Sequence, residues 1–433
     1  MKIFFSVGEP SGDLHGANLI RELQRLRPDI RCAGYGGPRM AEAGCELHFE
    51  LTKLAVMWFA RVLWNLLTFF QLCRRADRYF QTERPDAVVL IDYPGFNWWI
   101  ARRAKRHGIP VYYFSPPQIW AWASWRIAKM RKYVDHVLSG LPFEAAWLAE
   151  QGVRATFVGH PYFDEVRRQK LEHDFIDQLH LQGQWVTLLP GSRSQEVELN
   201  LPIMLRAAAL IRARVPRVNF AIAAFTARHA QLARRLLADV PLDVAVYVGK
   251  TPELIAVADC CLATSGSVSL ELLHHKKPTV IVYMISRLAM WVQQWFVRVR
   301  YITLINLLLA KEIFLGQKEY SGTWGQQAGR GGRDKPPEKA LFPEYLTWQD
   351  KSPQIAAHLI RWLLVEEYHD GVAAELGKLK AKIAHGGASR NAAQIIMAEV
   401  IDRAAQPLAP HYQPQRETAE MTQTTETAQG KAA

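Results

Sequence analysis

The sequence predicts an α/β protein of two domains, each with a mostly parallel β-sheet that has helices on both faces. Short apolar runs ending in or near Gly, Pro, Ser or Asp alternate with helical patterns such as Gly16–Leu26 and Leu199–Arg214, as in parallel sheets. The chain has 433 residues, of which 49% are hydrophobic. This length suffices for two domains of about 150 to 200 residues each.

The predicted strands are the short apolar runs taken in chain order. They are Ile3–Val7, Ala87–Ile91, Val111–Phe114, Val134–Leu138, Val186–Leu189, Phe220–Ala223, Val244–Val248 and Val280–Tyr283. Ligands of parallel sheets bind at the carboxyl ends of the strands. The loops that directly follow these runs are therefore the first candidates for a functional site.

The domain boundary is predicted within 167–184, a charged stretch without strong apolar periodicity. We expect a first domain at 1–175 and a second at 176–403. The segment 317–339 is rich in Gly, Gln and charge, which predicts a mobile surface insertion in the second domain. The last segment, 404–433, has the composition of a disordered tail, because it holds too few apolar residues to fold alone.

The charge and the cysteines restrict the partners and the compartment. A formal net charge of +12 suits nucleic acid, anionic lipid or a phosphorylated substrate. No nucleic-acid-binding module is visible, so no nucleic-acid partner is predicted. The odd number of cysteines and the absence of zinc-type spacing predict a reducing compartment, the cytoplasm, and no structural metal. The N-terminal apolar run is too short for a secretory signal.

Two loops of the first domain place polar residues directly after a strand. Gly8–Gly16 is a Gly-rich turn that opens a helix, whose free amide groups can face a phosphate or a sugar. The alternative is a tight turn in which Ser11 or Asp13 caps the helix. Asp92 follows Ala87–Ile91, where a carboxylate can accept the proton of an attacking hydroxyl. The alternative is that Asp92 only caps the next helix.

Two loops of the second domain have the chemistry of a diphosphate site. In Pro190–Glu196, Arg193 offers a planar guanidinium to phosphate oxygens, and the helix that follows adds partial positive charge. In Thr264–Glu271, small residues allow close approach of a diphosphate, and Glu271 can accept hydrogen bonds from ribose hydroxyls. The alternatives are an ordinary turn with an exposed arginine and a purely structural helix start.

A helix with a wide apolar face is predicted over Ala55–Arg75. Arg61 interrupts an apolar run that is already short for a bilayer crossing, so the helix is predicted to lie at a membrane surface. A second candidate is Arg287–Arg300, where aromatic residues are flanked by arginine. The alternative is a helix packed inside the protein or at a dimer face. The residues predicted to face the membrane are Trp58, Phe59, Val62, Leu63, Leu66, Leu67 and Phe70.

These loops resemble the lipid-A-disaccharide synthases, family 19 of the glycosyltransferases, and the resemblance runs from Lys2 to about Asp402. Several distinct strings occur in the order of that family, which makes the signal specific. The strings are GEPSGDLHGANLI (8–20), GGPRMAEAGCE (36–46), IDYPGFN (91–97), SPPQIWAW (115–122), LPFE (141–144), VGHP (158–161), LPGSRSQEV (189–197) and SGSVSLE (265–271).

The resemblance implies a GT-B architecture, in which two Rossmann-like domains face each other across a cleft. It implies that Asp92 is the catalytic base and that Arg193 and the loop 265–271 bind UDP. Asn306 and Glu312 match an asparagine and a glutamate of the family's NLL-x-x-x-E element. The implied substrate-binding residues are Glu9, Ser11, Gly12, Asn97, Arg193, Glu196, Ser265, Gly266, Ser267, Glu271, Asn306 and Glu312.

The implied reaction is an inverting sugar transfer without a cofactor or a metal. The 6-hydroxyl of 2,3-diacylglucosamine 1-phosphate attacks the anomeric carbon of UDP-2,3-diacylglucosamine, which gives a β-1,6-linked disaccharide 1-phosphate and UDP. The implied location is peripheral, on the cytoplasmic face of the inner membrane.

The chain departs from the family pattern at Trp58, Arg61, Met284 and Ile305, and in the insertion 317–339. Two alternatives therefore stay open at this point. One is another GT-B enzyme that uses a different UDP-sugar and lipid acceptor. The other is an inactive, lipid-binding paralogue.

Overall fold

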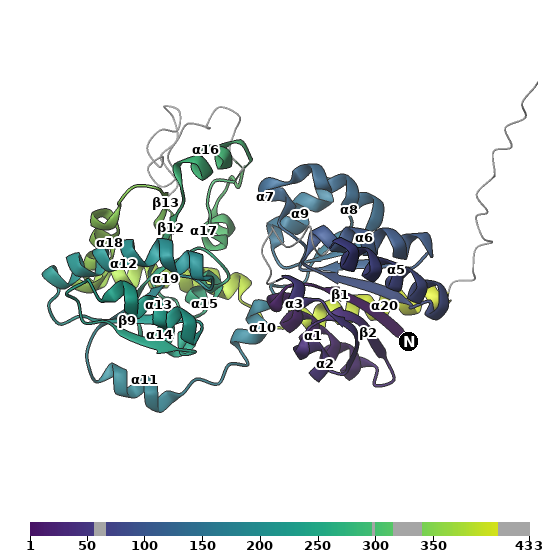
Figure 1. Cartoon of the computed structure of the whole chain (residues 1–433), viewed down its shortest axis with the longest axis horizontal. Coiled ribbons are helices and arrows are strands. Elements are labelled where there is room, and N and C mark those ends of the chain that lie inside the picture. Colours follow the sequence, from purple (N-terminus) through teal and green to yellow (C-terminus); the bar gives the residue numbers. More distant parts are fainter. Residues whose placement is uncertain (56–65, 297–298, 315–339, 406–433) are drawn as a thin grey trace, which may run out of the picture.

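A computed structural model describes residues 1–55, 66–296, 299–314 and 340–405. Two lobes lie side by side, each an α/β unit (Figure 1). Each lobe is built on one sheet in which every pair of neighbouring strands is parallel. The predicted α/β class is confirmed.

The first sheet has seven strands in the order β3-β2-β1-β4-β5-β6-β7. Every residue of the central strands β4 and β5 is buried, which explains why they are continuous apolar runs without alternation. The strands are β1 (Lys2–Val7), β2 (Arg31–Gly36), β3 (Cys45–Glu50), β4 (Ala87–Ile91), β5 (Val111–Phe114), β6 (His136–Ser139) and β7 (Ala155–Phe157).

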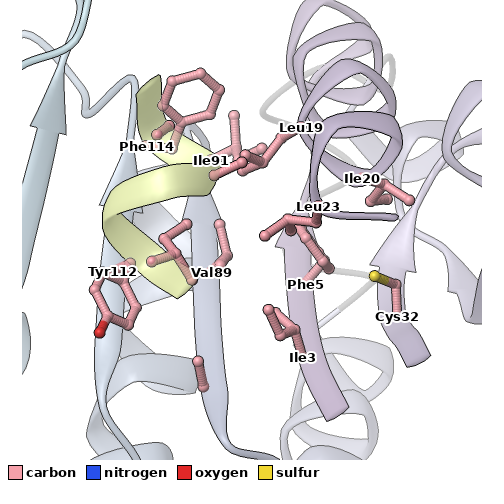
Figure 2. Close-up of a cluster of buried hydrophobic side chains, with 14 of the residues drawn as sticks. Ile3, Phe5, Leu19, Ile20, Leu23, Cys32, Val89, Ile91, Tyr112 and Phe114 are labelled. Carbon is pink, nitrogen blue, oxygen red and sulfur yellow. The ribbon is translucent and has the colours of Figure 1, made fainter. Parts of the chain in front are cut away.

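Helices cover both faces of the first sheet. One face packs on α1 (Pro10–Leu26), α2 (Pro38–Glu42) and α20 (Ala388–Ala405), and Figure 2 shows Leu19 and Leu23 of α1 facing the strand side chains. The opposite face packs on α5, α6 and α8. The other elements of this lobe are α3 (Thr52–Ala55), α5 (Leu66–Glu83), α6 (Pro94–Arg106), α7 (Ile119–Trp122), η1 (Ser124–Arg126), α8 (Ile127–Tyr133) and α9 (Pro142–Glu150).

The second sheet has six strands in the order β10-β9-β8-β11-β12-β13. Its strands are β8 (Trp185–Leu189), β9 (Asn219–Ala224), β10 (Ala245–Val248), β11 (Cys260–Ala263), β12 (Thr279–Met284) and β13 (Glu344–Thr347). Its helices are α12 (Ser194–Arg214), α13 (Ala227–Leu237), α14 (Thr251–Val257), α15 (Val268–His274), α16 (Arg287–Phe296), α17 (Leu304–Leu309), α18 (Ser352–Leu364) and α19 (Glu366–Ile383). One face packs on α12 and α18, and the other packs on α14, α15 and α19.

The chain crosses between the lobes twice. The first crossing follows α10 (Tyr162–Val166), and the second joins α19 to α20. The two crossings are tied together, because the Asp164 carboxylate accepts hydrogen bonds from the amides of Gly387, Ala388 and Ser389, at 2.5, 3.2 and 2.9 Å. Asp164 thus caps the first turn of α20.

The last helix lies in the first lobe, whereas the predicted span 176–403 placed it in the second. Ala392, Ile396 and Val400 are buried in the core between α20 and the first sheet. The apolar face of α20 is complementary to α1 rather than to its neighbours in sequence, and local pattern does not reveal such a long-range pairing.

The stretch 167–184, in which the domain boundary was predicted, contains α11 (His173–His180). Ile176 and Leu179 are buried with residues of α14, so this helix belongs to the second lobe. The predictions for Trp58, Phe59, Val62 and Leu63, for the insertion 317–339 and for the tail beyond 405 lie outside the described residues. Within the described part of the chain, no helix is long and apolar enough to cross a membrane.

Candidate functional site

Strand register brings the predicted loops together in pairs. Val7, the last residue of β1, is paired with Ile91, the last residue of β4, so the loops that begin at Gly8 and Asp92 leave the sheet side by side. In the second lobe Leu189 of β8 is paired with Ala263 of β11. The arginine loop and the small-residue loop therefore also emerge next to each other, at the carboxyl edge of their sheet.

Asp92 lies in a strained turn. Asp92 and Tyr93 both have left-handed backbone conformations, with φ of +48° and +45°, which cost free energy in residues other than glycine. The Asp92 carbonyl accepts hydrogen bonds from Asn97 Nδ2 at 2.7 Å and from the Tyr113 hydroxyl at 2.5 Å. The N-cap residue of α6 is Tyr93, and no side-chain hydrogen bond caps that helix. The structure therefore does not give Asp92 the capping role of the alternative interpretation.

Asn97 holds this turn through buried hydrogen bonds of its side chain. Its side chain is 0% exposed, and its amide also donates to the carbonyls of Ser6 and Ile91, both at 3.2 Å. Its Oδ1 accepts the Ser6 hydroxyl at 2.7 Å. All polar atoms of this side chain thus have partners inside the protein, so Asn97 positions the Asp92 loop, whereas the family resemblance suggested a substrate contact.

The environment of Asp92 favours a proton acceptor. Burial raises the pKa of the Asp92 carboxyl above its ordinary value. Burial also raises the pKa of Glu9, the negative charge of Asp92 raises it further, and the positive charge of Arg193 lowers it. Glu9 is therefore within electrostatic reach of residues from both lobes, and the Asp92 loop and the arginine loop face one shared region.

The first loop leaves the N-terminal amides of α1 without a side-chain cap. The N-cap residue is Glu9, and its side chain makes no capping hydrogen bond. Asp13, a candidate cap, instead accepts hydrogen bonds from the amides at the start of α2, including Gly37 at 2.9 Å and Met40 at 3.1 Å. Ser11 is exposed. The alternative of a capped turn is thus wrong for Asp13.

The arginine loop is held by Glu196, and its arginine points outward. Glu196 accepts hydrogen bonds from the amides of Ser192 at 3.0 Å and Arg193 at 3.2 Å. Gly191 has φ +124°, and a Cβ there would lie 2.6 Å from Glu196 atoms, so only glycine fits. The side chain of Arg193 is 78% exposed and pairs with Glu196 at 3.2 Å. A diphosphate can reach this guanidinium without rearrangement of the loop.

The small-residue loop is open at its tip and closed at its base. Gly266 and Ser267 are exposed, and no atom lies within 4 Å of a Cβ built on Gly266. Ser265 donates its hydroxyl to the Ile302 carbonyl at 2.9 Å. Glu271 is only 3% exposed and accepts the Tyr162 hydroxyl at 2.8 Å, and burial raises its pKa. The backbone of this loop is accessible, whereas the predicted ribose ligand Glu271 is enclosed.

Asn306 stabilises the fold of the second lobe. It is 2% exposed, donates to the Phe342 carbonyl at 2.8 Å and to Glu344 at 2.6 Å, and accepts the Phe342 amide at 3.0 Å. These bonds join α17 to the start of β13 and to the segment before it. Glu312 is exposed and pairs with Arg300 at 3.3 Å. Of these two predicted substrate contacts, only Glu312 presents its side chain to solvent.

Sequence reasoning missed a buried polar cluster formed by residues of α7, β6 and α9. Glu144 accepts hydrogen bonds from Trp120 Nε1 at 2.8 Å and from the Ser139 hydroxyl at 2.6 Å, and burial raises the pKa of Glu144 to about 7. Trp120 and Glu144 belong to two of the strings that carry the family resemblance, which was the signal available. Among the described residues, no group of three His, Cys, Asp or Glu side chains is arranged to hold a metal.

Comparison with known proteins finds relatives along most of the chain. A family model described as lipid-A-disaccharide synthetase matches residues 3–322. A lipid-A-disaccharide synthase of Coxiella burnetii (strain CbuG_Q212) is 33% identical over 402 residues, which cover 91% of this chain and 97% of the relative. The synthase of Anaeromyxobacter dehalogenans (strain 2CP-1 / ATCC BAA-258) is 34% identical over 399 residues, with 92% and 97% covered.

Solved structures of much lower identity share the fold. A UDP-GlcNAc 2-epimerase of Neisseria meningitidis, bound to UDP-GlcNAc, has a TM-score of 0.58 at 12% identity, with 93% of this chain and 100% of that chain covered. The calicheamicin glycosyltransferase has a TM-score of 0.54 at 15% identity, with 94% and 99% covered. The architecture is GT-B, as the resemblance implied. With a family match over most of its length and the two strand-end loops of a sugar transferase, the chain belongs to the lipid-A-disaccharide synthase family of hexosyltransferases.

Proposed function

We propose that this protein transfers 2,3-diacylglucosamine from UDP to the 6-hydroxyl of 2,3-diacylglucosamine 1-phosphate, with Asp92 as the base. The observation that carries the assignment is that Asp92 and Arg193 lie in strand-end loops of different lobes, after β4 and β8, and that the charges of both act on Glu9. A carboxylate from one lobe and a guanidinium from the other act on the same region. Inverting transfer requires such a proton acceptor opposite a stabilised leaving diphosphate.

The proposed step balances without a metal. The acceptor hydroxyl gives its proton to Asp92 as its oxygen forms a bond to the anomeric carbon, while the bond from that carbon to the diphosphate oxygen breaks. UDP leaves with the electron pair. Arg193 and the exposed backbone at Gly266 and Ser267 stabilise the developing negative charge by hydrogen bonds.

The test is a product assay with purified protein. We expect a disaccharide 1-phosphate, detected by mass spectrometry, when UDP-diacylglucosamine and the monosaccharide 1-phosphate are both present. UDP-N-acetylglucosamine, which lacks the long acyl chains, serves as the matched control donor. A disaccharide formed only from a different UDP-sugar would support the alternative enzyme, and protein without transferase activity on any of these donors would overturn the proposal.

We further propose that the first lobe binds the membrane surface through α5, α6 and α7, as a peripheral protein on the cytoplasmic face of the inner membrane. Leu66, Leu67 and Phe70 of α5 are 54%, 75% and 56% exposed, so they do not belong to the core. Phe70, Trp99 and Trp122 are all exposed, and each has the arginine four residues later near its ring: Arg74 at 5.8 Å, Arg103 at 6.0 Å and Arg126 at 4.8 Å. Aromatic rings beside arginines suit a boundary between acyl chains and phosphate headgroups.

Vesicle co-sedimentation tests this surface. Changing Leu66, Leu67 and Phe70 together to serine should lower binding to anionic vesicles and leave the melting temperature nearly unchanged, because these side chains are exposed. The matched control is serine at Leu181 and Phe225 of the second lobe, which are 88% and 66% exposed. Equal vesicle binding by wild type and the triple variant would contradict the proposed surface. A large loss of stability in the triple variant would show that these residues pack inside the protein.

A further inference from the structure

A cavity of about 290 Å³ lies between α15 and the segment that follows α10. It is lined by Val166, Arg167, Gln169, Leu171, His274 and His275. This volume is near the lower end of small-molecule sites. The cavity lies at the opposite end of α15 from Ser267, about 10 Å along the helix axis, so it is separate from the loop proposed to bind UDP.

The charges around the cavity are positive and uncompensated. His274 has its pKa lowered by burial and then by the positive charges of Lys380 and Arg167. The pKa of His275 is also lowered, first by burial and then by the charges of His274, Lys277 and Lys380. No acidic group in the described part of the chain counteracts these shifts. Like charges held together without acidic partners destabilise the empty site and favour a bound anion.

The backbone carbonyls at this end of α15 already have hydrogen-bond partners, one of which is a basic side chain. The carbonyls of Glu271, Leu272 and Leu273 accept hydrogen bonds from the amides of the residues just beyond the helix, at 3.0, 2.9 and 3.0 Å. The His274 carbonyl accepts the Lys380 ammonium at 2.7 Å. The usual negative end of the helix is thus largely neutralised.

Two donors at the cavity have no partner. In the described structure, the Arg167 guanidinium makes no ion pair with an acidic side chain, and the buried His274 Nδ1 has no hydrogen-bond partner. A buried polar atom without a partner is costly, and a bound ligand can supply one. The guanidinium geometry matches a pair of phosphate oxygens, and an imidazole can donate to a third.

We propose that this cavity binds a small phosphate-type anion, either inorganic phosphate or the terminal phosphate of a phosphomonoester. The site lies where both crossings of the chain meet. Arg167 belongs to the first crossing, and a Cβ on Gly386 of the second crossing would lie 2.9 Å from its side chain. An anion bound here holds the start of the first crossing against α15, the helix that begins at the small-residue loop.

The test is thermal unfolding with inorganic phosphate, compared with chloride at equal ionic strength. A ligand that binds the folded state raises the melting temperature in a saturable way. We expect this for wild type and for Arg193→Ala, in which the proposed UDP site lacks its arginine. In Arg167→Gln the phosphate dissociation constant should rise at least tenfold, because a charge-assisted bond is lost. Lys378→Gln is the matched control, because it removes one charge from an exposed residue of α19 that is paired with Glu375. It should change the phosphate dissociation constant less than twofold.

His274→Ala is a second variant, used if Arg167→Gln does not fold, and it should also weaken phosphate binding because it removes the unpartnered Nδ1. The affinity of the wild type for a phosphomonoester such as glycerol 1-phosphate is compared with its affinity for inorganic phosphate. The higher of the two affinities distinguishes the two sources of the anion. Three outcomes would overturn the proposal: no saturable effect of phosphate, an effect lost in Arg193→Ala but kept in Arg167→Gln, or an equal loss in Lys378→Gln. None of these outcomes depends on transferase activity, so failure here is distinguishable from failure of the proposed reaction.

Discussion

The Asp92 loop and the arginine loop both follow a parallel strand, but they are built in opposite ways. Around Asp92 the backbone is strained and bound by buried side chains, notably Asn97 and Tyr113. Around Arg193 the loop is held by local bonds, notably those of Glu196, and the arginine side chain is 78% exposed. One loop fixes a half-buried carboxylate, and the other presents a solvated cation.

The difference corresponds to the two tasks in the proposed reaction. A base must be within hydrogen-bond reach of one proton and must have a suitable pKa, and burial and a rigid turn provide both. A phosphate-binding arginine has a charge that does not titrate near neutral pH, and its long side chain can follow the ligand. Substitutions in the first loop should therefore affect turnover, and those in the second should affect binding.

Asp92→Asn should have the largest effect. Turnover should fall about a hundredfold or more, the scale of a lost general base, while the dissociation constant of the UDP-sugar stays within about twofold. Asparagine tolerates the left-handed backbone that this position requires, so the turn should persist. Product formation and calorimetric titration with the UDP-sugar measure the two quantities. Unchanged turnover would remove Asp92 from the chemistry.

Gly8→Ala tests whether the rigidity of the Asp92 turn matters. A Cβ at Gly8 would lie 2.3 Å from the ring of Tyr93, so the ring and the turn must move. We expect kcat to fall about tenfold or more, because misplacement of about 1 Å can cost that much. Gly95→Ala is the matched control, since no atom lies within 4 Å of a Cβ there. Equal activity of both variants with wild type would show that the turn can shift freely.

Arg193→Ala tests the arginine loop. We expect UDP-sugar affinity to fall about tenfold or more, the scale of a lost charge-assisted hydrogen bond, without a change in melting temperature. Arg206→Ala on α12, the helix that follows the arginine loop, is the control. It removes the same charge about 20 Å away, where the arginine pairs with Asp350. If affinity in Arg193→Ala matched that of the control, the arginine would have no role in binding.

The sequence predicted the strands that precede these two loops and the positions of the loops, but not how each side chain is used. Buried central strands such as β4 and β5 are long apolar runs, so they were found. The strands β2, β3, β7, β11 and β13 were not among the predicted runs. Two of them are mostly half buried or exposed: β3 has one buried residue and β7 has none. β2 is buried but contains two glycines. Edge or Gly-containing strands have a weak apolar signal.

The roles of Asn97, Asn306 and Glu271 could not be read from spacing. Each is less than 4% exposed and is bound by groups that are distant in sequence, such as Ser6, Phe342 and Tyr162. A motif identifies residues that matter, but only the fold separates a side chain that can reach a ligand from one that holds the loop beneath it. Glu9, Asp92 and Arg193 are the predicted residues that the fold brings together.

The pH dependence of the two loops gives the smallest effect and the sharpest contrast. Burial raises the pKa of Asp92 above 3.8, so its base form is lost at a higher pH than for an ordinary aspartate. We expect kcat to fall as the pH drops through this raised pKa, while UDP-sugar binding stays flat, because the guanidinium of Arg193 does not titrate in this range.

The free energy of unfolding depends on pH with the opposite sign. A carboxyl with a raised folded pKa stabilises the fold most when protonated, and this contribution is lost as the pH rises through that pKa. Asp92→Asn, which is neutral at every pH, should therefore be at least as stable as wild type at pH 7, with a difference that shrinks in acid. Thermal melts of both proteins across the same pH range measure it, and a variant that is less stable at pH 7 would mean that the ionised carboxylate supports the turn.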